Sequence, residues 1–231
     1  MTRAIIFSQG SGSRWGETTV IKLPCIYKQL IPLGKETITS RVIRQLKEAG
    51  IDDVWLISTP DLFQGEGVKS YALRDHDVGS IIQGFIKVRH LWKDFDDVLF
   101  ILGDVIFSNQ DFNKLLSTVE THLFGRFGGN PITGKAAKEI FAFRLVGSPE
   151  HRSWIYGNLV LLVNQTTFPG KLKLWDWYNT LKGFGNFPEK INFMAVGESY
   201  TDDIDSLQEF KQFYPTLLKE VLKDDENKRN T

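Results

Sequence analysis

The residues best suited to chemistry stand in three stretches near the beginning, middle and end of the chain. The first is the glycine-rich segment Gln9-Gly10-Ser11-Gly12-Ser13-Arg14, with Lys28 a short distance behind it. The second is Gly103-Asp104, and the third is an acidic segment that contains Asp203 and Asp205. Arginine and lysine suit phosphate oxygens, and carboxylates suit Mg²⁺. Together the three stretches predict chemistry on a phosphorylated substrate.

The glycine-rich segment is a candidate phosphate-binding loop. Its two glycines let the backbone approach a phosphate closely, and its two serines add hydroxyl donors. Arg14 adds a planar guanidinium group. The spacing matches neither the dinucleotide-binding pattern, because Gly16 comes one residue late, nor the P-loop, which requires Gly-Lys-Ser/Thr. On the segment alone, an ordinary turn between a strand and a helix remains the alternative.

The elements around this segment predict where it lies. The apolar run 4–7 predicts a buried strand, and helical spacing of apolar residues over 38–49 predicts a helix that Gly50 ends in the left-handed conformation. The apolar run 54–57 predicts a second strand. The order strand, loop, helix, strand is a βαβ unit. Its crossover places the loop at the carboxyl end of the first strand, where open α/β sheets bind ligands.

Asp104 is predicted to lie at the same edge of the sheet. It follows five consecutive apolar residues, 98–102, which indicate a strand buried on both faces. A carboxylate at the end of such a strand either caps a turn or binds a metal ion. Beside a phosphate-binding loop, we interpret it as a Mg²⁺ ligand.

Further helices and strands complete an α/β pattern. We expect helices over about 79–92, from Asp111 to Val119, and from about Leu207, the last broken or kinked at Pro215. We expect β-strands over 139–146, 154–163 and 191–197, and mostly loop over 60–78.

Composition excludes several classes of protein. Twenty-eight basic residues balance twenty-eight acidic ones, so charge gives no reason to expect a nucleic-acid or membrane-surface partner. The single Cys25 excludes an internal disulfide framework and fits a reducing cytoplasm. No apolar run approaches the ~20 residues of a membrane-spanning helix. The four histidines lack metal-ligand spacing, and no serine stands in a nucleophile elbow, which argues against hydrolases of those kinds.

The chain resembles the sugar-phosphate nucleotidyltransferases and the related phosphocholine cytidylyltransferases. Their amino-terminal signature is a buried strand, Gly-x-Gly-x-Arg, Lys-x-Leu-x-Pro and a helix, and Gly10–Arg14 and Lys28–Pro32 match it. Gly103-Asp104 is similar to the family's Gly-Asp motif, and the segment 203–206 to its closing Asp-x-Asp-Ser/Thr motif. Ser8-Gln9 stands where two alanines are usual. The resemblance extends from residue 3 to about residue 213.

The resemblance implies a three-layer αβα sandwich with a mostly parallel, Rossmann-like sheet of the nucleotide-diphospho-sugar transferase type. It also implies a cytoplasmic, Mg²⁺-dependent enzyme of sugar-nucleotide biosynthesis. Such an enzyme transfers a nucleotidyl group from a nucleoside triphosphate to a small phosphorylated acceptor and releases pyrophosphate. The residues implied are Arg14 and Lys28 for catalysis, Gln9, Gly10, Ser11, Gly12, Ser13, Gly79 and Ser80 for the nucleotide, and Asp104, Asp205 and then Asp203 for Mg²⁺. Lys22 is an alternative to Lys28, and Ser80 is equally suited to capping a helix.

We expect one domain over 1–223, with a nucleotide-binding half at 1–122, an acceptor-binding half at 123–200, the metal motif and last helix at 201–223, and a flexible tail at 224–231. Asp202 is expected to be exposed. Trp175, Trp177 and Tyr178 are expected to lie in the core. Candidate acceptor contacts are the polar residues Arg126, Lys135, Glu139, Arg144, Tyr156 and Asn158, and for each of them an ordinary surface or turn role is the alternative.

Two alternatives of other classes are open. One is a glycosyltransferase of similar architecture with a nucleotide-sugar donor, although the middle of the chain offers Asp104-Val105-Ile106 in place of an Asp-x-Asp motif. The other is a non-catalytic nucleotide-binding domain. The acceptor (a sugar 1-phosphate, phosphocholine or a similar small phosphate), the base and the oligomeric state cannot be read from the sequence.

Overall fold

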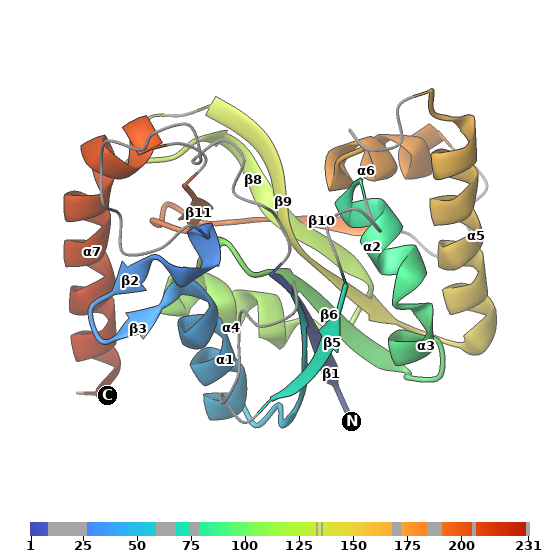
Figure 1. Cartoon of the computed structure of the whole chain (residues 1–231), viewed down its shortest axis with the longest axis horizontal. Helices are drawn as coiled ribbons and strands as arrows, with labels where there is room; N and C mark the ends of the chain where they lie inside the picture. Colours follow the sequence, from blue (N-terminus) through green and yellow to red (C-terminus); the bar gives the residue numbers. More distant parts are fainter. Residues whose placement is uncertain are drawn as a thin grey trace.

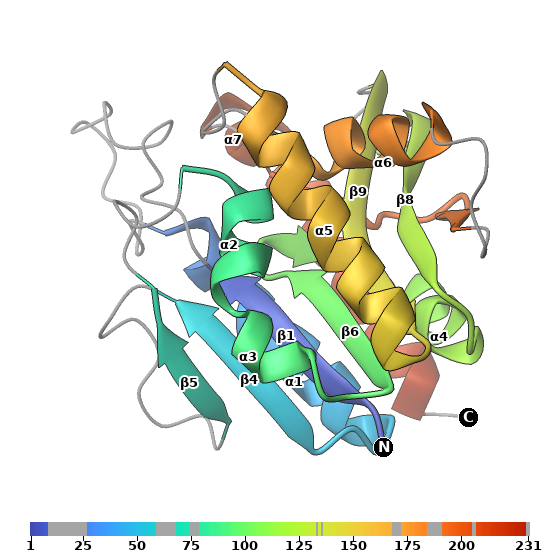
Figure 2. The ribbon, with the colours of Figure 1, turned by 90° about the vertical axis from the view of Figure 1, so that its right-hand side faces the viewer.

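A computed structural model describes residues 1–8, 27–58, 68–73, 79–132, 134, 136–167, 172–183, 191–204 and 207–229. Over these ranges the chain forms a central sheet with helices on both faces (Figures 1 and 2). The predicted α/β fold class is confirmed. Within the described ranges, we find no helix with the length and apolarity to span a membrane.

The central sheet has seven described strands. In spatial order they are β10 (Asn192–Ala195), β8 (His122–Gly129), β9 (Ala136–Val146), β6 (Asp97–Leu102), β1 (Arg3–Ser8), β4 (Asp53–Ser58) and β5 (Lys69–Ala72). Strand β9 runs antiparallel to its neighbours β6 and β8, and the other neighbouring pairs are parallel. Because β1 pairs with β4 on one side and β6 on the other, the sheet has its switch point between β1 and β6.

Helices cover both faces of the sheet. One face carries α2 (Ile81–Lys87), α3 (Arg89–Trp92), α5 (Pro149–Gln165) and α6 (Leu174–Gly183), and Figure 2 shows α5 lying across it. The other face carries α1 (Ile38–Glu48) and α4 (Asn109–Ser117). Outside these, α7 (Leu207–Arg229) packs near a small hairpin of β2 (Pro32–Leu33) and β3 (Glu36–Thr37) (Figure 1). Short elements near the site are the 3-10 helix η1 (Lys28–Leu30) and the strands β7 (Val105–Ile106) and β11 (Asp202–Asp203).

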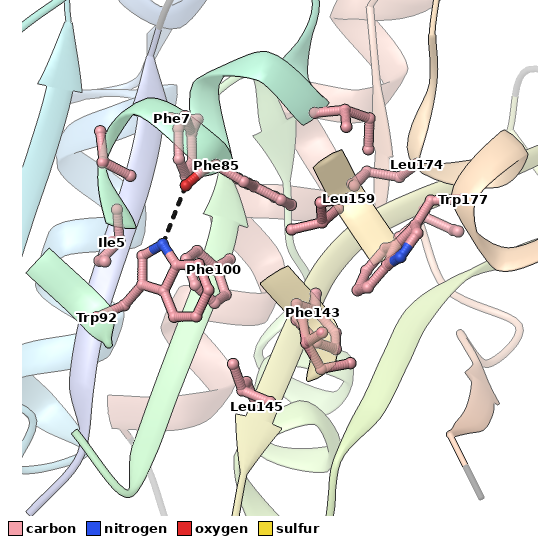
Figure 3. Packing of buried hydrophobic residues seen from close by; sticks show 14 of the residues in the cluster. Ile5, Phe7, Phe85, Trp92, Phe100, Phe143, Leu145, Leu159, Leu174 and Trp177 are labelled. Atoms are coloured by element: carbon pink, nitrogen blue, oxygen red, sulfur yellow. Dashed lines mark hydrogen bonds between the residues drawn. The ribbon is translucent and has the colours of Figure 1, made fainter. Parts of the chain in front are cut away.

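An aromatic core fixes the helices of the first face to the sheet (Figure 3). Phe100 of β6 and Phe143 of β9 stack with ring centroids 5.6 Å apart. Trp177 of α6 meets Phe143 edge-to-face at 4.7 Å. The indole N–H of Trp92 donates to the carbonyl of Phe85 at 3.0 Å, so its polar atom is satisfied inside the core. Strands and helices that border the site are therefore held rigidly.

Most predicted elements are present with small shifts. The helix expected over 38–49 is α1, and Gly50 follows it with φ +78° as its left-handed cap requires. The helix expected over 79–92 is divided at Val88 into α2 and α3. The loop expected over 60–78 contains β5 at its end.

The strand predicted over 154–163 is wrong, because this segment lies in α5. Its buried residues Ile155, Asn158, Leu159 and Leu162 recur at helical spacing. Ser148 caps the helix by accepting from the N–H of His151, and Pro149 stands in the first turn. These start signals outweigh the strand propensity of the branched and aromatic residues.

The tail predicted at 224–231 is also wrong for its described part, because α7 continues through Pro215 to Arg229. The guanidinium of Arg41 donates to both carboxylate oxygens of Asp225, at 2.7 and 2.6 Å. Arg41 is 1% exposed, so an unpaired charge there would be costly. Asp224 and Asp225 are thus partly buried partners of Arg41 in α1, while 226–228 are exposed in the same helix.

Candidate active site

The site is built at the switch point, where β1 and β6 end side by side. The N–H of Gly103, directly after β6, donates to the carbonyl of Phe7 at 2.8 Å. The hydroxyl of Thr39 in α1 donates to the carbonyl of Gly103 at 3.0 Å. The turn that carries Asp104 is therefore held from both sides, by β1 and by the first turn of α1.

Gly103 is required by the close approach of β1. A Cβ atom on this residue would lie 2.1 Å from Ser8 Oγ and 3.1 Å from the Phe7 carbonyl oxygen. Ser8 is fully buried, and its Oγ lies 3.2 Å from Thr39 Oγ1. Sequence reasoning missed Thr39 and gave Ser8 no structural role, because both act through contacts distant in sequence.

A second, short ladder brings the carboxyl-terminal acidic segment to Asp104. Strand β11 pairs antiparallel with β7, so that Asp203 lies opposite Val105 and Asp202 opposite Ile106. The guanidinium of Arg126 donates to the carbonyls of Ser199 and Thr201, at 3.1 and 2.5 Å, which holds the approach to β11. Because β7 begins one residue after Asp104, this pairing places Asp203 next to it.

Asp202 does not have the exposure that we predicted. Its side chain is 5% exposed, and one carboxylate oxygen accepts from the side-chain amide of Asn130 at 2.6 Å. The other oxygen accepts from the N–H of Asp203 at 3.1 Å. In a strand, neighbouring residues point to opposite sides, so pairing with β7 turns Asp202 inward.

Lys28 lies between the two predicted metal-binding aspartates. Its Nζ is 3.7 Å from Asp104 Oδ2 and 3.8 Å from Asp203 Oδ2. All three side chains are largely buried, with 14%, 27% and 17% of their surface exposed for Lys28, Asp104 and Asp203. The beginning, middle and end of the chain therefore meet here. The predicted residues Gln9–Arg14 and Asp205, and the alternative Lys22, lie outside the described residues.

Three carboxylates, including that of Asp203 but not that of Asp104, form a cluster. One oxygen from each of Glu139, Asp202 and Asp203 lies within 4.8 Å of the other two. An all-oxygen donor set of this kind suits a hard divalent cation such as Mg²⁺. Sequence reasoning placed Glu139 among the acceptor contacts. In the β8–β9 pair Glu139 lies opposite Arg126, and this register brings it to the acidic segment. The register depends on pairing between strands and could not be read from the local sequence.

A cavity of about 350 Å³ adjoins these groups. Its wall includes Leu102 and Val105, which flank Gly103-Asp104, and also Asp203 and Glu139. The rest of the wall comes from the start of α2, from β9 and from α6 with the residues before it: Ile81, Lys138, Ile140, Phe141, Leu172, Lys173, Leu174 and Trp175. A cavity of this size can hold a small metabolite.

Gly79 and Ser80, predicted to contact the nucleotide, form the start of α2. The hydroxyl of Ser80 accepts from the N–H of Gln83 at 3.3 Å, and the N–H of Gly79 donates to Gln83 Oε1 at 2.7 Å. The helix-capping role of Ser80 is thus present. The next residue, Ile81, lines the cavity, so this helix start also borders the site.

Three of the predicted acceptor contacts support the fold instead. Arg126 is committed to backbone carbonyls, and Asn158 donates to the Trp154 carbonyl within α5. Arg144 donates through two nitrogens to Asp97, at 2.9 and 2.8 Å. Burial opposes ionisation of Asp97, but hydrogen bonds and charge from Arg144 outweigh it and lower the pKa of that carboxyl.

The other residues that we singled out between 123 and 200 differ in how they agree with the predictions. The Tyr156 ring lies under the guanidinium of Arg89 at 4.4 Å, away from the cavity wall. Lys135 lies outside the described residues. Trp177 is fully buried and Tyr178 nearly so, as predicted for core residues. Trp175 is only partly buried and lines the cavity, so the core prediction is incomplete for this residue.

Comparison with known proteins agrees with this geometry. A family model described as "MobA-like NTP transferase domain" matches residues 4–125, which is 122 of the 231 residues. The matched region contains β1, α1, β6 and the Gly103-Asp104 turn.

Solved structures similar to this chain share its fold over nearly their whole lengths. The inositol-1-phosphate CTP transferase of T. maritima has a TM-score of 0.66 at 14% identity, with 95% of each chain covered. A protein of Bacillus anthracis described as a glucose-1-phosphate thymidylyltransferase has a TM-score of 0.60 at 18% identity, with 94% of this chain and 96% of that chain covered. The CTP:phosphocholine cytidylyltransferase of Streptococcus pneumoniae has a TM-score of 0.59 at 17% identity, with 94% and 99% covered.

Proposed function

The chain belongs to the family of MobA-like NTP transferase domains and is a nucleotidyltransferase, and from this premise we propose its reaction. The enzyme transfers a nucleoside monophosphate from a nucleoside triphosphate to a small phosphorylated acceptor and releases pyrophosphate, with Mg²⁺ as cofactor. The observation that carries the proposal is the meeting of Lys28 with Asp104 and Asp203 beside the cavity. Such a reaction fits a cytoplasmic enzyme, since nucleoside triphosphates are available there.

In this proposal Asp104 and Asp203 hold Mg²⁺, and Asp205 joins them. The acidic cluster supports the assignment of Asp203, because oxygens of Glu139 and Asp202 lie within 4.8 Å of one of its carboxylate oxygens. Mg²⁺ is commonly held by one or two carboxylates together with substrate phosphates. When bound, the ion would neutralise charge on phosphate oxygens.

Lys28 supplies the mobile positive charge of the site. Its ammonium faces Asp104 and Asp203 at 3.7 and 3.8 Å, in reach of any phosphate that these carboxylates help to bind. A lysine ammonium is a compact charge on a flexible chain and can turn from carboxylates to phosphates. We propose that the Lys28 ammonium contacts both the α-phosphate and the acceptor phosphate, because these two anions must approach each other.

The attacking group is the acceptor's phosphate oxygen, which is ionised at neutral pH, so the reaction requires no strong general base. It attacks the α-phosphorus in line, and pyrophosphate leaves. Positioning and charge stabilisation would supply the rate enhancement. We assign the segment Gln9–Ser13 to the triphosphate and Arg14 to the departing pyrophosphate. The position of β1 supports this assignment, because the strand ends at Ser8, directly before the segment, and lies beside the Gly103-Asp104 turn.

The test is a panel of four nucleoside triphosphates against phosphorylated acceptors, with pyrophosphate release as the measurement. We expect release with at least one pair, and a loss of about two decades in turnover for Asp104→Asn, as when one electrostatic stabiliser is removed. Asp94→Asn is the matched control, because that side chain is 74% exposed and lies 3.8 Å from the ammonium of the adjacent Lys93.

The other outcomes identify the alternatives. Nucleotide binding without pyrophosphate release on any acceptor would indicate a non-catalytic domain. Consumption of a nucleotide sugar in place of a triphosphate would indicate a glycosyltransferase. Normal turnover of Asp104→Asn at saturating Mg²⁺ would remove the metal assignment.

A further inference from the structure

We propose that the cavity beside Asp203 accepts a substrate with an oxygen-rich head, either hydroxylated or anionic, and rejects one with a quaternary ammonium head. Lys138 and Trp175 make this choice. The inference rests on the proposed function, since it concerns the acceptor of the same site. It decides between two of the acceptor classes that the sequence leaves open, the sugar phosphates and phosphocholine.

Lys138 of β9 is an exposed residue that lines the cavity. Alternation along a strand puts Lys138 on the same side as Ile140, which packs with the residues of α6 in the aromatic core. Its Nζ lies 5.8 Å from the ring centroid of Trp175 and 5.3 Å from that of Phe127. The ammonium thus lies near two aromatic rings, of which that of Trp175 lines the cavity.

Lys173 adds a second positive charge to the same wall. It lies directly before α6, and its backbone N–H donates to Asp176 at 2.8 Å, which fixes the start of the helix. The cavity also contains the carboxylates of Glu139 and Asp203. Both carboxylates belong to the acidic cluster with Asp202, whereas the charged residues of the cavity wall next to Trp175, in space or in sequence, are the two lysines, Lys138 and Lys173.

The aromatic part of this wall is rigid. Trp175 shares α6 with Leu174 and Trp177, which are buried against the sheet (Figure 3). Trp175 also packs against Tyr178 and Phe193, with ring centroids 5.2 and 5.9 Å away. The position of its ring next to Lys138 is therefore set by the core and not by the ligand.

This arrangement disfavours a cationic head for an electrostatic reason. Proteins recognise quaternary ammonium groups with aromatic faces, and here Trp175 already faces an ammonium of the protein. A second cation would meet Lys138 as a like charge, which is strongly unfavourable in a partly enclosed site. Hydroxyl, carboxylate or phosphate oxygens would instead accept hydrogen bonds from the lysine ammonium groups.

The experiment measures binding and turnover of three acceptors: glucose 1-phosphate, glucuronic acid 1-phosphate and phosphocholine. Isothermal titration in Mg²⁺ gives affinity, and pyrophosphate release with the best triphosphate gives kcat/KM. We expect the full chain to prefer at least one sugar phosphate over phosphocholine by about tenfold or more. Comparing the two sugars separates recognition of hydroxyls from recognition of a second anion.

Lys138→Met is the decisive variant, because it keeps an unbranched apolar chain against the rings and removes the charge. We expect this variant to reduce the preference for the sugar phosphate over phosphocholine by about tenfold. Lys93→Met is the control, since that exposed lysine pairs with the adjacent Asp94. Its preference should equal that of the unmodified chain.

Each outcome is decisive. Equal or tighter binding of phosphocholine overturns the inference, as does failure of all three acceptors to bind, or a preference that Lys138→Met leaves unchanged. If the binding preference is found and responds to Lys138→Met but no triphosphate yields pyrophosphate, the inference holds and the proposed reaction fails.

Discussion

Asp203 lies directly opposite Val105 in the antiparallel pair of β11 and β7, and this register places its carboxylate beside Asp104. Lys28 then lies within 4 Å of both aspartates. The site is thus made by a two-residue ladder that joins segments from the middle and end of the chain. Its geometry leads to the following predictions.

Replacing Lys28 by methionine should tighten Mg²⁺ binding in the absence of nucleotide, by about tenfold, while turnover falls by about two decades. In the proposed site the ammonium would compete with the ion for Asp104 and Asp203, so its removal would leave both carboxylates to Mg²⁺. Titration calorimetry with Mg²⁺ and a pyrophosphate assay measure the two effects. Lys93→Met is the control for both. Unchanged Mg²⁺ affinity would show that the ammonium and the ion occupy separate places.

Asp203→Asn and Asp202→Asn should have different effects although the residues are adjacent. Because Asp203 faces Lys28 in the site, the Asp203→Asn variant should have a lower turnover and should require a higher Mg²⁺ concentration. Asp202 is buried and accepts a hydrogen bond from Asn130, so its amide variant should chiefly lose stability, by about 1–3 kcal/mol. Pyrophosphate release against Mg²⁺ concentration and urea unfolding separate the two. A larger catalytic loss at Asp202 would reverse our assignment.

Gly103→Ala should destabilise the protein by about 1–3 kcal/mol and reduce activity, because the new Cβ would lie 2.1 Å from Ser8 Oγ. Ser8→Ala in the same chain removes that oxygen and should restore part of the loss. Restoration should be incomplete, since the Phe7 carbonyl oxygen is 3.1 Å from the same point. Thermal unfolding of both single variants and the double variant gives the coupling between the positions. Additive effects would mean that the contact with Ser8 is not the cause.

Asp225→Asn should cost about 3 kcal/mol of stability at neutral pH, because it removes the nearer of two carboxylates that pair with the buried Arg41 and leaves Asp224, at 3.6 Å. Burial opposes ionisation of Asp225, but hydrogen bonds and charge from Arg41 outweigh it and lower its pKa. The stabilisation is therefore complete above the unfolded pKa of about 4 and is lost as the pH falls through the lower folded value. Urea unfolding from pH 7 to pH 2 should show this loss in the unmodified chain and a smaller one in the variant.

Lys228→Ala is the control for that experiment. Lys228 pairs with Glu48 across the same two helices, at 2.6 Å, but both side chains are 39% exposed. A surface pair of this kind contributes at most about 1 kcal/mol. If Lys228→Ala were as damaging as Asp225→Asn, the burial of Arg41 would not explain the stability of the helix pair.

Local patterns were sufficient to predict the first half of the fold. The apolar runs of β1, β4 and β6 and the capped amphipathic α1 have periods and end signals that a short window of sequence contains. The segment 154–163 misled the same reasoning, because its branched and aromatic residues suit a strand and only Ser148 and Pro149 before it indicate a helix. Asp225 could not be interpreted either, since its partner Arg41 lies at the other end of the chain.

The sequence by itself determined which residue types are available for phosphate and metal chemistry, and that Asp104 follows a buried strand. Only the tertiary structure decided which of them meet. The pairing of β11 with β7 selects Asp203 and turns Asp202 inward, and the register of β9 brings Glu139 to them and Lys138 to Trp175. The physical reason is that one strand position moves a side chain to the opposite face, and that choice is made by pairing with distant segments.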